Sequence, residues 1–428
     1  MKSWMLAAAA AGLTIYGTAL AAQDAKPAAA KPALAAQPAR PAPPPGFRTV
    51  PLGHGPWDYD TKAGKIHVEV VARQLDHPWS LAELPDGTLL VTERAGRLRV
   101  IRDGRLDPVA VAGLPPINPA GIGGLYDIAL DPDFAGNHYI YLSYVKPSEP
   151  NHDQTTLAVM RGTWDGTAQL KDVHDVFVAD AWYGARPWPK RCCGQGPAYG
   201  SWGGRLLFGR DGKLYVTSGD RNYGEMVQRH DNDFGKIMRI NPDGSIPRDN
   251  PFVGKEGWKP EIWTLGHRNP LGLTIDPATG KMWETEFGPE GGDELNLIEK
   301  GKDYGWIEVT QGHHYNGEPA KGIKNVPGMT DPVLDFGPPS LNPGNPVFYD
   351  ASAIPGWKGD LLLPSYTKGM LRYATKEGMP VGEPEYLLGD LQQRLRDAKV
   401  GHDGEIYLTT DETDGAVLKI TPGSSAGE

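Results

Sequence analysis

Residues 85–101 read PDGTLLVTERAGRLRVI, and this stretch carries the pattern that decides the fold. The triplet Pro85-Asp86-Gly87 is typical of a tight turn, because aspartate and glycine accept the backbone angles that turns require. A mainly apolar run follows it, and a second turn at Ala95-Gly96 leads into another such run. Two short strands joined by a tight turn predict a β-hairpin.

The same pattern of a polar turn followed by a short apolar strand returns five more times along the chain. The copies are DPDFAGN-HYIYLSYV at 131–145, RDG-KLYVTSGD at 210–220, ATG-KMWETEFG at 278–288, WKG-DLLLPSY at 357–366 and HDG-EIYLTTD at 402–411. Short strands that repeat at such intervals are typical of propeller blades. The sequence therefore predicts an all-β protein, a six-bladed β-propeller. We expect the strand KIHVEVVAR at 65–73 to close the ring with the last blade.

The first residues of the chain predict export. Residues 1–21 have a basic start, a short apolar run and a small-residue cleavage site, which is the layout of a secretory signal peptide. Residues 22–46 are nearly all alanine and proline with scattered charges, so we expect a disordered tether. The propeller domain is then expected at 47–428. No later stretch is long and apolar enough for a membrane span, which predicts a periplasmic or secreted protein.

Composition excludes other classes of protein. The 55 glycines and 40 prolines among 428 residues indicate many turns and few long helices. The net charge of −10, without a long basic run, argues against a nucleic-acid partner. The two cysteines are adjacent in the sequence, so no disulfide framework holds the fold and its stability must come from the core.

Several longer segments resemble one known family, the soluble quinoprotein glucose/sorbosone dehydrogenases, which include the aldose sugar dehydrogenases. The likeness runs from about residue 75 to 420. The segments that carry it are LDHPWSLAELPDGTLLVTERAGRLRVI (75–101), GGLYDIALDPDF (123–134), GGRLLF (203–208), TSGD (217–220), GKIMRINPDGSIPRDNPF (235–252), TLGHRNPLGL (264–273), EFGPEGGDELNLI (286–298), KGKDYGW (300–306) and RLRDAKVGHDGEIYLTTD (394–411). The resemblance implies a six-bladed propeller that holds pyrroloquinoline quinone (PQQ) and calcium and oxidises sugars in the periplasm. An external quinone or cytochrome would then receive the electrons.

The resemblance also implies which residues hold the cofactor. Arg268 and Asn269 in GHRN stand where the family places an arginine and an asparagine against the quinone. Arg394 and Arg396 in RLRD match an arginine pair that binds the carboxylates of the cofactor. An arginine suits both tasks, because its planar fork of donors can clamp a carboxylate or polarise a quinone oxygen.

Metal ligation is implied in the same way. Gly288 and Pro289 match a loop whose backbone carbonyls ligate the cofactor's calcium. Oxygen ligands are the ones that this hard cation takes. The acidic residues around this loop, Glu286, Asp293 and Glu294, are open to a role in binding calcium or in stabilising the turn.

The sequence departs from the family pattern at four polar positions. Gly200 or Ser201 stands where the family has its catalytic histidine, and Ile122 stands in place of a glutamine. Phe287 replaces the polar residue before Gly-Pro, and Thr367 replaces a lysine. These departures place the catalytic base in question.

Two residues are candidates for that base. Asp220 matches the carboxylate that orients the family's histidine, and His267 precedes the first arginine of the site. Oxidation of a hydroxyl group of a sugar needs a base for the hydroxyl proton beside an electrophilic quinone. Asp220 is alternatively a turn-capping aspartate, and His267 is alternatively structural.

Cys192 and Cys193 lie in an aromatic-rich insertion, 180–200. Neighbouring Cα atoms are ~3.8 Å apart, below the usual range for a disulfide, so a bond between them would make a strained ring. By analogy with larger quinoprotein alcohol dehydrogenases, that ring would be a platform stacked on the quinone. The alternative is a pair of thiols without such a role.

Three functions fit these observations. The first is a PQQ-dependent dehydrogenase with calcium, acting on a sugar or a related alcohol and using Asp220 in proton abstraction. The second is a propeller that has lost the quinone and acts as a calcium-dependent hydrolase or lyase of the lactonase type. The third is a non-catalytic glycan-binding propeller, which the aromatic insertion would serve.

Overall fold

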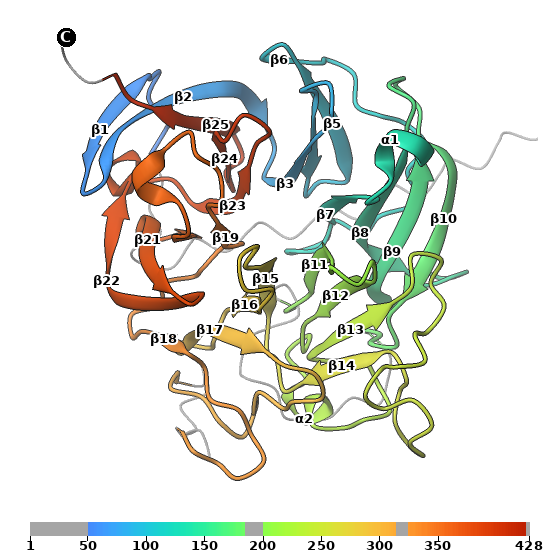
Figure 1. Ribbon diagram of the computed structural model, residues 1–428. Coiled ribbons are helices and arrows are strands. Elements are labelled where there is room, and N and C mark those ends of the chain that lie inside the picture. The colour runs from blue at the N-terminus through green and yellow to red at the C-terminus, as the bar shows by residue number, and fades with distance from the viewer. Residues whose placement is uncertain (1–49, 185–199, 314–323, 425–428) are drawn as a thin grey trace, which may run out of the picture. The chain divides into compact units, whose positions relative to one another are not determined.

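The computed structural model describes residues 50–184, 200–313 and 324–424. These residues form six β-sheets arranged around a centre, which confirms the predicted six-bladed propeller (Figure 1). The innermost strand of each sheet contacts the innermost strands of the sheets on either side. No described helix is long and apolar enough to cross a membrane.

The strands run outward from the centre in chain order within five of the sheets. The first sheet holds β3 (Pro78–Glu83), β4 (Leu89–Glu93), β5 (Arg97–Arg102) and β6 (Arg105–Leu106). The second holds β7 (Leu125–Leu130), β8 (Tyr139–Pro147), β9 (Thr155–Thr163) and β10 (Lys171–Val178). The third holds β11 (Gly203–Phe208), β12 (Leu214–Ser218), β13 (Lys236–Ile240) and β14 (Ile262–Leu265). The fourth holds β15 (Pro270–Ile275), β16 (Met282–Glu286), β17 (Asp293–Ile298) and β18 (Leu334–Phe336). The fifth holds β19 (Val347–Phe348), β20 (Leu361–Ser365), β21 (Gly369–Lys376) and β22 (Met379–Leu387).

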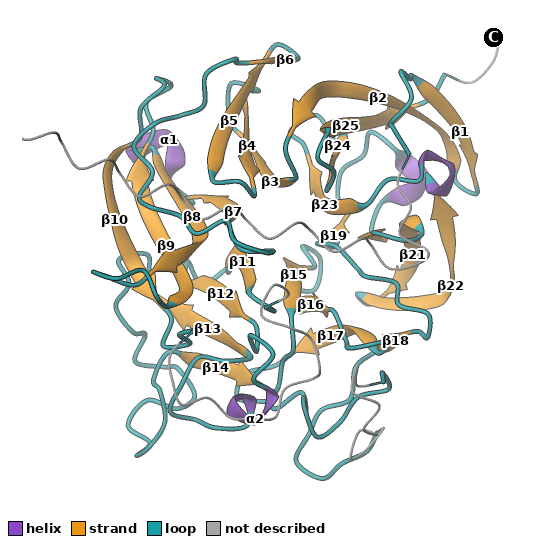
Figure 2. Cartoon of the chain, turned by 180° about the vertical axis from the view of Figure 1, so that it is seen from behind, coloured by secondary structure: helices purple, strands orange, loops and turns teal. Residues whose placement is uncertain are grey.

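The sixth sheet joins the two ends of the described chain. Its inner strands are β23 (Leu395–Val400), β24 (Ile406–Thr410) and β25 (Gly415–Pro422), and its outer strands are β2 (Gly64–Leu75) and β1 (Trp57–Thr61). β2 pairs with β25 in antiparallel register, with Val68 opposite Ile420. The expectation that 65–73 closes the ring is therefore confirmed. Figure 2 shows the same arrangement from behind, and helix in the described residues is confined to four short segments, α1 (Phe134–Asn137), α2 (Gly224–Val227), η2 (Pro355–Trp357) and η3 (Gly389–Leu391).

The turn chemistry read from the sequence is present in the first hairpin. Gly87 has a φ of +80°, a left-handed conformation in which a side chain would be strained. The carboxylate of Asp86 accepts a 3.0 Å hydrogen bond from the backbone N–H of Thr88. β4 then begins at Leu89, and all five of its residues are buried between neighbouring sheets. The Asp-Gly pair thus fixes where the strand starts.

A buried ion network ties four inner strands together at the centre. Arg205 of β11 donates to Asp127 of β7 at 3.1 Å and to Asp397 of β23 at 3.2 Å. The hydroxyl of Ser80 of β3 lies within hydrogen-bond distance of both carboxylates, and the Arg205 guanidinium lies 4.1 Å from the ring of Trp79. None of these four polar side chains is more than 1% exposed. Pairing keeps the cost of these buried charges down.

Candidate active site

The predicted site residues lie at one end of the inner strands. Asp220 follows β12, and Gly288 follows β16. His267, Arg268 and Asn269 lie between β14 and β15, immediately before an inner strand begins. Arg394 and Arg396 lie at the start of the inner strand β23. The propeller therefore brings together residues that lie far apart in the sequence.

Asp220 is completely buried and held in a fixed position. One carboxylate oxygen, Oδ2, accepts a 2.8 Å hydrogen bond from the indole Nε1 of Trp306. The other, Oδ1, accepts a 2.7 Å bond from the backbone N–H of Asn222. The backbone N–H of Asp220 donates to the carbonyl of Arg268 at 2.8 Å, which ties two site loops together.

The electrostatic environment of Asp220 suits a proton acceptor. Burial raises the pKa of Asp220 above its usual value, against the opposing effects of Arg268 and of the hydrogen bonds from Asn222, Trp306 and Ser201. A carboxylate with a raised pKa is a stronger base once it is ionised. The side chain of Ser201, at the position of the family's histidine, thus contacts Asp220 directly.

Arg268 and Asn269 connect the site loops of the third and fourth blades. Nη1 of Arg268 donates to the carbonyl of Phe287 at 2.8 Å and to that of Gly288 at 2.5 Å. Its guanidinium carbon lies 5.6 Å from the ring of Trp306. Oδ1 of Asn269 accepts a 3.1 Å bond from the backbone N–H of Gly203. Arg268 therefore lies between the partner of Asp220 and the expected calcium loop.

Arg394 and Arg396 form ion pairs with acidic residues that follow β24. Nη2 of Arg396 lies 2.6 Å from Oδ2 of Asp411, and Arg394 pairs with Glu412 at 3.2 Å. Burial of Asp411 would raise its pKa, but Arg396 and a hydrogen bond from His77 hold that pKa well below its usual value. Asp411 is therefore ionised and keeps the arginine pair in place.

The loop that is expected to bind calcium is held by its own acidic residue, Asp293. Asp293 accepts hydrogen bonds from the backbone N–H groups of Gly288 at 2.9 Å and Asn342 at 2.7 Å. The Gly288 carbonyl already accepts from Arg268. A cation at Gly288 and Pro289 would therefore share that oxygen with a guanidinium.

His267 lies deeper than the arginines. Its side chain is 0% exposed, and its ring stacks on Tyr304 with centroids 4.9 Å apart. Nε2 pairs with Oγ1 of Thr264 at 2.9 Å, and Nδ1 lies 3.7 Å from Oε2 of Glu286. These contacts bury the ring among Thr264, Glu286 and Tyr304.

Three of the four residues that depart from the family pattern make apolar contacts or bind the backbone. Ile122 and Phe287 pack against an apolar cluster that includes Trp79, Tyr126 and Trp202. The ring of Phe287 also packs edge to face against the ring of Tyr366, with their centroids 5.6 Å apart. The hydroxyl of Thr367 donates to the carbonyl of Leu341 at 2.9 Å. The site is consequently more apolar than the family pattern implies.

Sequence reasoning missed some of the residues around the site. Trp306 lies in the quoted KGKDYGW segment, but its role as donor to Asp220 was not predicted. Arg94 and Arg221 were also not predicted, and together with Arg396 they oppose the rise in the pKa of Tyr126 that burial causes. Arg221 follows Asp220 directly, and that adjacency was the available signal. Cys192 and Cys193 lie outside the described residues.

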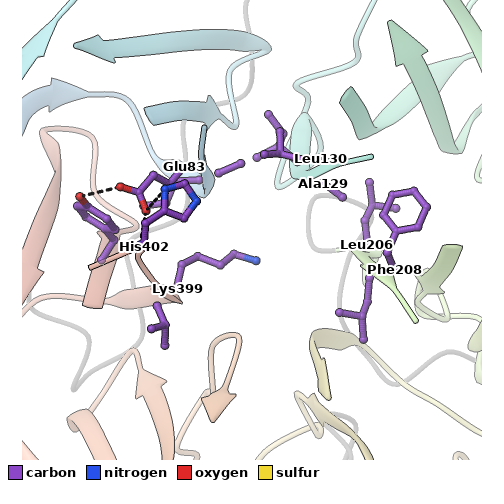
Figure 3. A pocket seen from close by; sticks show the side chains of 13 residues that line it. Glu83, Ala129, Leu130, Leu206, Phe208, Lys399 and His402 are labelled. Atoms are coloured by element: carbon purple, nitrogen blue, oxygen red, sulfur yellow. Dashed lines mark hydrogen bonds and ion pairs between the residues drawn. The ribbon is translucent and has the colours of Figure 1, made fainter. Parts of the chain in front are cut away.

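A cavity of about 320 Å³ lies at the opposite ends of the inner strands. The last residues of β3, β7, β11 and β23 line it, whereas the arginines lie where such strands begin. Figure 3 shows Glu83, His402 and Lys399 on one side and Leu130, Leu206 and Phe208 on the other. This cavity is therefore distinct from the candidate site.

The family model for glucose/sorbosone dehydrogenase matches residues 75–419. The chain is 36% identical to the aldose sugar dehydrogenase YliI of Escherichia coli over 361 residues, covering 83% of this chain and 93% of that protein. It is 27% identical to quinoprotein glucose dehydrogenase B of Acinetobacter calcoaceticus, covering 84% and 88%. Among solved structures, the apo form of the soluble Escherichia coli aldose sugar dehydrogenase covers 84% of this chain and 100% of that one, with a TM-score of 0.75 and 36% identity. The PQQ-bound aldose sugar dehydrogenase of Streptomyces coelicolor has a TM-score of 0.65 and 28% identity, covering 84% and 98%.

Proposed function

The chain belongs to the glucose/sorbosone dehydrogenase family of oxidoreductases, and we propose that it is a PQQ-dependent dehydrogenase of a sugar or a related alcohol. The observation that carries this proposal is the gathering of Arg268, Arg394 and Arg396 at the end of the ring where buried Asp220 lies. An anionic cofactor and a proton acceptor are the two parts that such an oxidation needs.

The residues present fit an aromatic polycarboxylate such as PQQ. Nε of Arg396 is buried and has no hydrogen-bond partner among the described residues, and a buried donor of this kind favours an anionic ligand. The guanidinium of Arg396 also lies 5.3 Å from the ring of Trp79 and 5.0 Å from that of Tyr366. We therefore assign Arg396 and Arg394 to the cofactor carboxylates, and Arg268 with Asn269 to its quinone edge.

When bound, PQQ supplies a quinone that accepts a hydride from the substrate carbon. The protein supplies the base. Asp220, which contacts Ser201, takes the hydroxyl proton of the substrate, with the Ser201 hydroxyl passing a proton inward as it receives one. Serine alone is a poor base at neutral pH, and the buried carboxylate behind it makes the transfer favourable. His267, held within the protein, has no part in this step.

Calcium at the carbonyls of Gly288 and Pro289 belongs to the same proposal. Support comes from the preference of calcium for carbonyl oxygens and from Asp293, which fixes the Gly288 backbone. Arg268 donates to the same carbonyl, so the cation and the guanidinium would divide its two lone pairs.

The setting of the reaction is also proposed. Residues 1–21 have the layout of a signal peptide, which supports a periplasmic or secreted enzyme with a tether at 22–46. The electrons would leave to an external quinone or cytochrome. A platform formed by Cys192 and Cys193 against the quinone remains part of the proposal.

The test is sugar-dependent reduction of an artificial electron acceptor by the purified protein. We expect turnover that requires added PQQ and calcium and that falls steeply in Asp220→Asn. The apolar surroundings of Ile122 and Phe287 favour a second candidate, a quinone-free hydrolase of the lactonase type. Calcium-dependent lactone hydrolysis without PQQ, and no sugar oxidation with it, would support that candidate instead. Glycan binding with no turnover would support a binding propeller.

A further inference from the structure

A second group of chemically active side chains lies behind the arginines, in the fourth blade. Glu284 and Glu286 are two residues apart on β16, so their side chains point to the same face of the sheet. His267 reaches this face from the loop between β14 and β15. One ligand atom from each of these three residues lies within 4.8 Å of the other two. We call His267, Glu284 and Glu286 the blade-4 cluster.

The charge of this cluster is not balanced by a basic side chain. Glu284, Glu286 and the neighbouring Glu294 are 0%, 3% and 6% exposed. The amide of Asn296 donates to Glu284 and Glu294, and the backbone N–H of Arg268 donates to Glu286. No lysine or arginine side chain in the described parts of the chain forms an ion pair with any of these three carboxyls; Nδ1 of His267 lies 3.7 Å from Oε2 of Glu286. Buried carboxylates without a counter-charge are costly.

Two buried atoms of the cluster also lack a hydrogen-bond partner among the residues that the structure describes. They are Nδ1 of His267 and Oε1 of Glu284, both on side chains that are 0% exposed. Nε2 of His267 pairs with the Thr264 hydroxyl, and the ring is stacked on Tyr304. The Thr264 hydroxyl can either accept a proton from Nε2 or donate one to it, and in the tautomer protonated at Nε2 the Nδ1 lone pair faces the Glu286 carboxylate. In that tautomer two electron-rich groups face each other, which is favourable when a cation lies between them.

We propose that the blade-4 cluster is a structural binding site for a divalent transition-metal ion, held by His267 Nδ1 and by the carboxylates of Glu284 and Glu286. Two carboxylates neutralise the charge of such an ion. The mixture of one imidazole nitrogen with carboxylate oxygens suits Zn²⁺ or Mn²⁺, whereas Ca²⁺ takes oxygen ligands. The Thr264 hydroxyl on Nε2 is the outer contact that orients a metal-binding histidine.

This metal would fix the loop that carries the cofactor contacts. Arg268 and Asn269 follow His267 directly, and the Arg268 N–H already binds Glu286. Anchoring His267 to β16 would therefore hold the start of β15 against its own blade. The inference stands apart from PQQ binding, because its three ligands are not among the residues assigned to the cofactor and it needs no quinone.

The test is the metal content of the full-length protein purified without PQQ, measured by mass spectrometry. We expect about one zinc or manganese ion per chain, and a loss of roughly tenfold or more in occupancy in Glu284→Gln. Glu93→Gln is the control, since Glu93 is also 0% exposed but is paired with Arg97 and Arg99 in another blade. In the Mn²⁺-loaded protein, pulsed electron paramagnetic resonance should show coupling to an imidazole nitrogen that His267→Gln removes.

The wild-type measurements decide the matter if the variants fail to fold. A protein that contains no zinc or manganese, and takes up neither when refolded with them, would overturn the proposal and show that the cluster holds protons instead. Uptake of calcium alone, or manganese without nitrogen coupling, would also overturn it. Each result can be obtained whether or not the protein binds PQQ.

Discussion

The indole Nε1 of Trp306 donates a 2.8 Å hydrogen bond to Oδ2 of Asp220, across 86 positions of sequence. The bond joins a loop after β17 to the turn after β12, and both residues are buried. Asp220 therefore has a fixed orientation before any ligand arrives. A pre-oriented carboxylate can accept a proton without first losing conformational freedom.

Asp220→Asn should abolish most of the activity. The amide keeps the shape of the side chain but cannot take a proton, so we expect kcat to fall by about 10²- to 10⁴-fold. The affinity for PQQ should change little, because Asp220 is not among the residues assigned to the cofactor. Steady-state kinetics with calorimetry of cofactor binding would separate the two effects. Equal losses in kcat and in cofactor affinity would assign Asp220 to binding instead.

Ser201→Ala tests the contact between Ser201 and Asp220. If the hydroxyl passes the proton, its removal should lower kcat by roughly 10-fold or more while the unfolding midpoint stays nearly unchanged. Ser143→Ala is a matched control, since Ser143 is also buried but lies in β8 of the second blade, away from Asp220. Full activity in Ser201→Ala would mean that Asp220 receives the proton directly.

The activity should depend on pH through Asp220. Burial raises the pKa of this carboxyl, so the active, ionised form should be lost at a pH above that expected for a free aspartate. The folded state then binds the proton more tightly than the unfolded state, so this group's contribution to stability falls as pH rises through the interval between the two pKa values. A profile of kcat/KM against pH should show an acidic limb that disappears in Asp220→Asn. A profile limited only by a group of ordinary carboxyl pKa would contradict this assignment.

The buried ion network at the centre should matter for stability. Arg205→Met leaves Asp127 and Asp397 buried without their cation, which should lower the free energy of unfolding by about 3–5 kcal/mol. Arg102→Met is the control, because its pair with Asp107 is about 40% exposed and should contribute below about 1 kcal/mol. Urea denaturation would compare them. Equal losses in the free energy of unfolding of the two variants would show that the central network stabilises the fold no more than an exposed ion pair.

The closing strand β2 should be as important as any inner strand. Ile66 and Val68 are 0% exposed and pack into the cluster shared by β24 and β25. Ile66→Ala should therefore cost about 2–5 kcal/mol, measured by denaturation. Glu69→Ala, at a half-buried position of the same strand, removes only an ion pair with Lys419 and should cost much less. A negligible effect of Ile66→Ala would mean that the ring holds without this closure.

The fold could be predicted because its signal is local and repeated. Asp86-Gly87 and the matching pairs Asp211-Gly212 and Asp403-Gly404 each fix a turn through their own backbone geometry, with Gly212 and Gly404 also left-handed. The strand expected at 65–73 pairs with β25 and closes the ring.

The site could be predicted only in part, because its contacts join distant segments. The sequence marked Arg268, Arg394, Arg396 and Asp220, but gave no sign that Trp306 would bind Asp220 or that Arg268 would donate to the Gly288 carbonyl. The burial of His267 depends on Tyr304 and Thr264, which pack around it only in the folded blade. The spacing of motifs in the sequence does not reveal packing of this kind.

The central claim is that the arginines at the end of the ring bind an anionic quinone. Calorimetric titration of the full-length apo protein with PQQ, in the presence of calcium, tests it most directly. The account predicts saturable binding at one site per chain and a loss of roughly 10- to 100-fold in affinity in Arg396→Met, whereas Arg229→Met, an exposed arginine paired with Asp231, leaves it unchanged. Absence of PQQ binding by the folded wild-type protein, or a PQQ affinity that is unchanged in Arg396→Met, would contradict it.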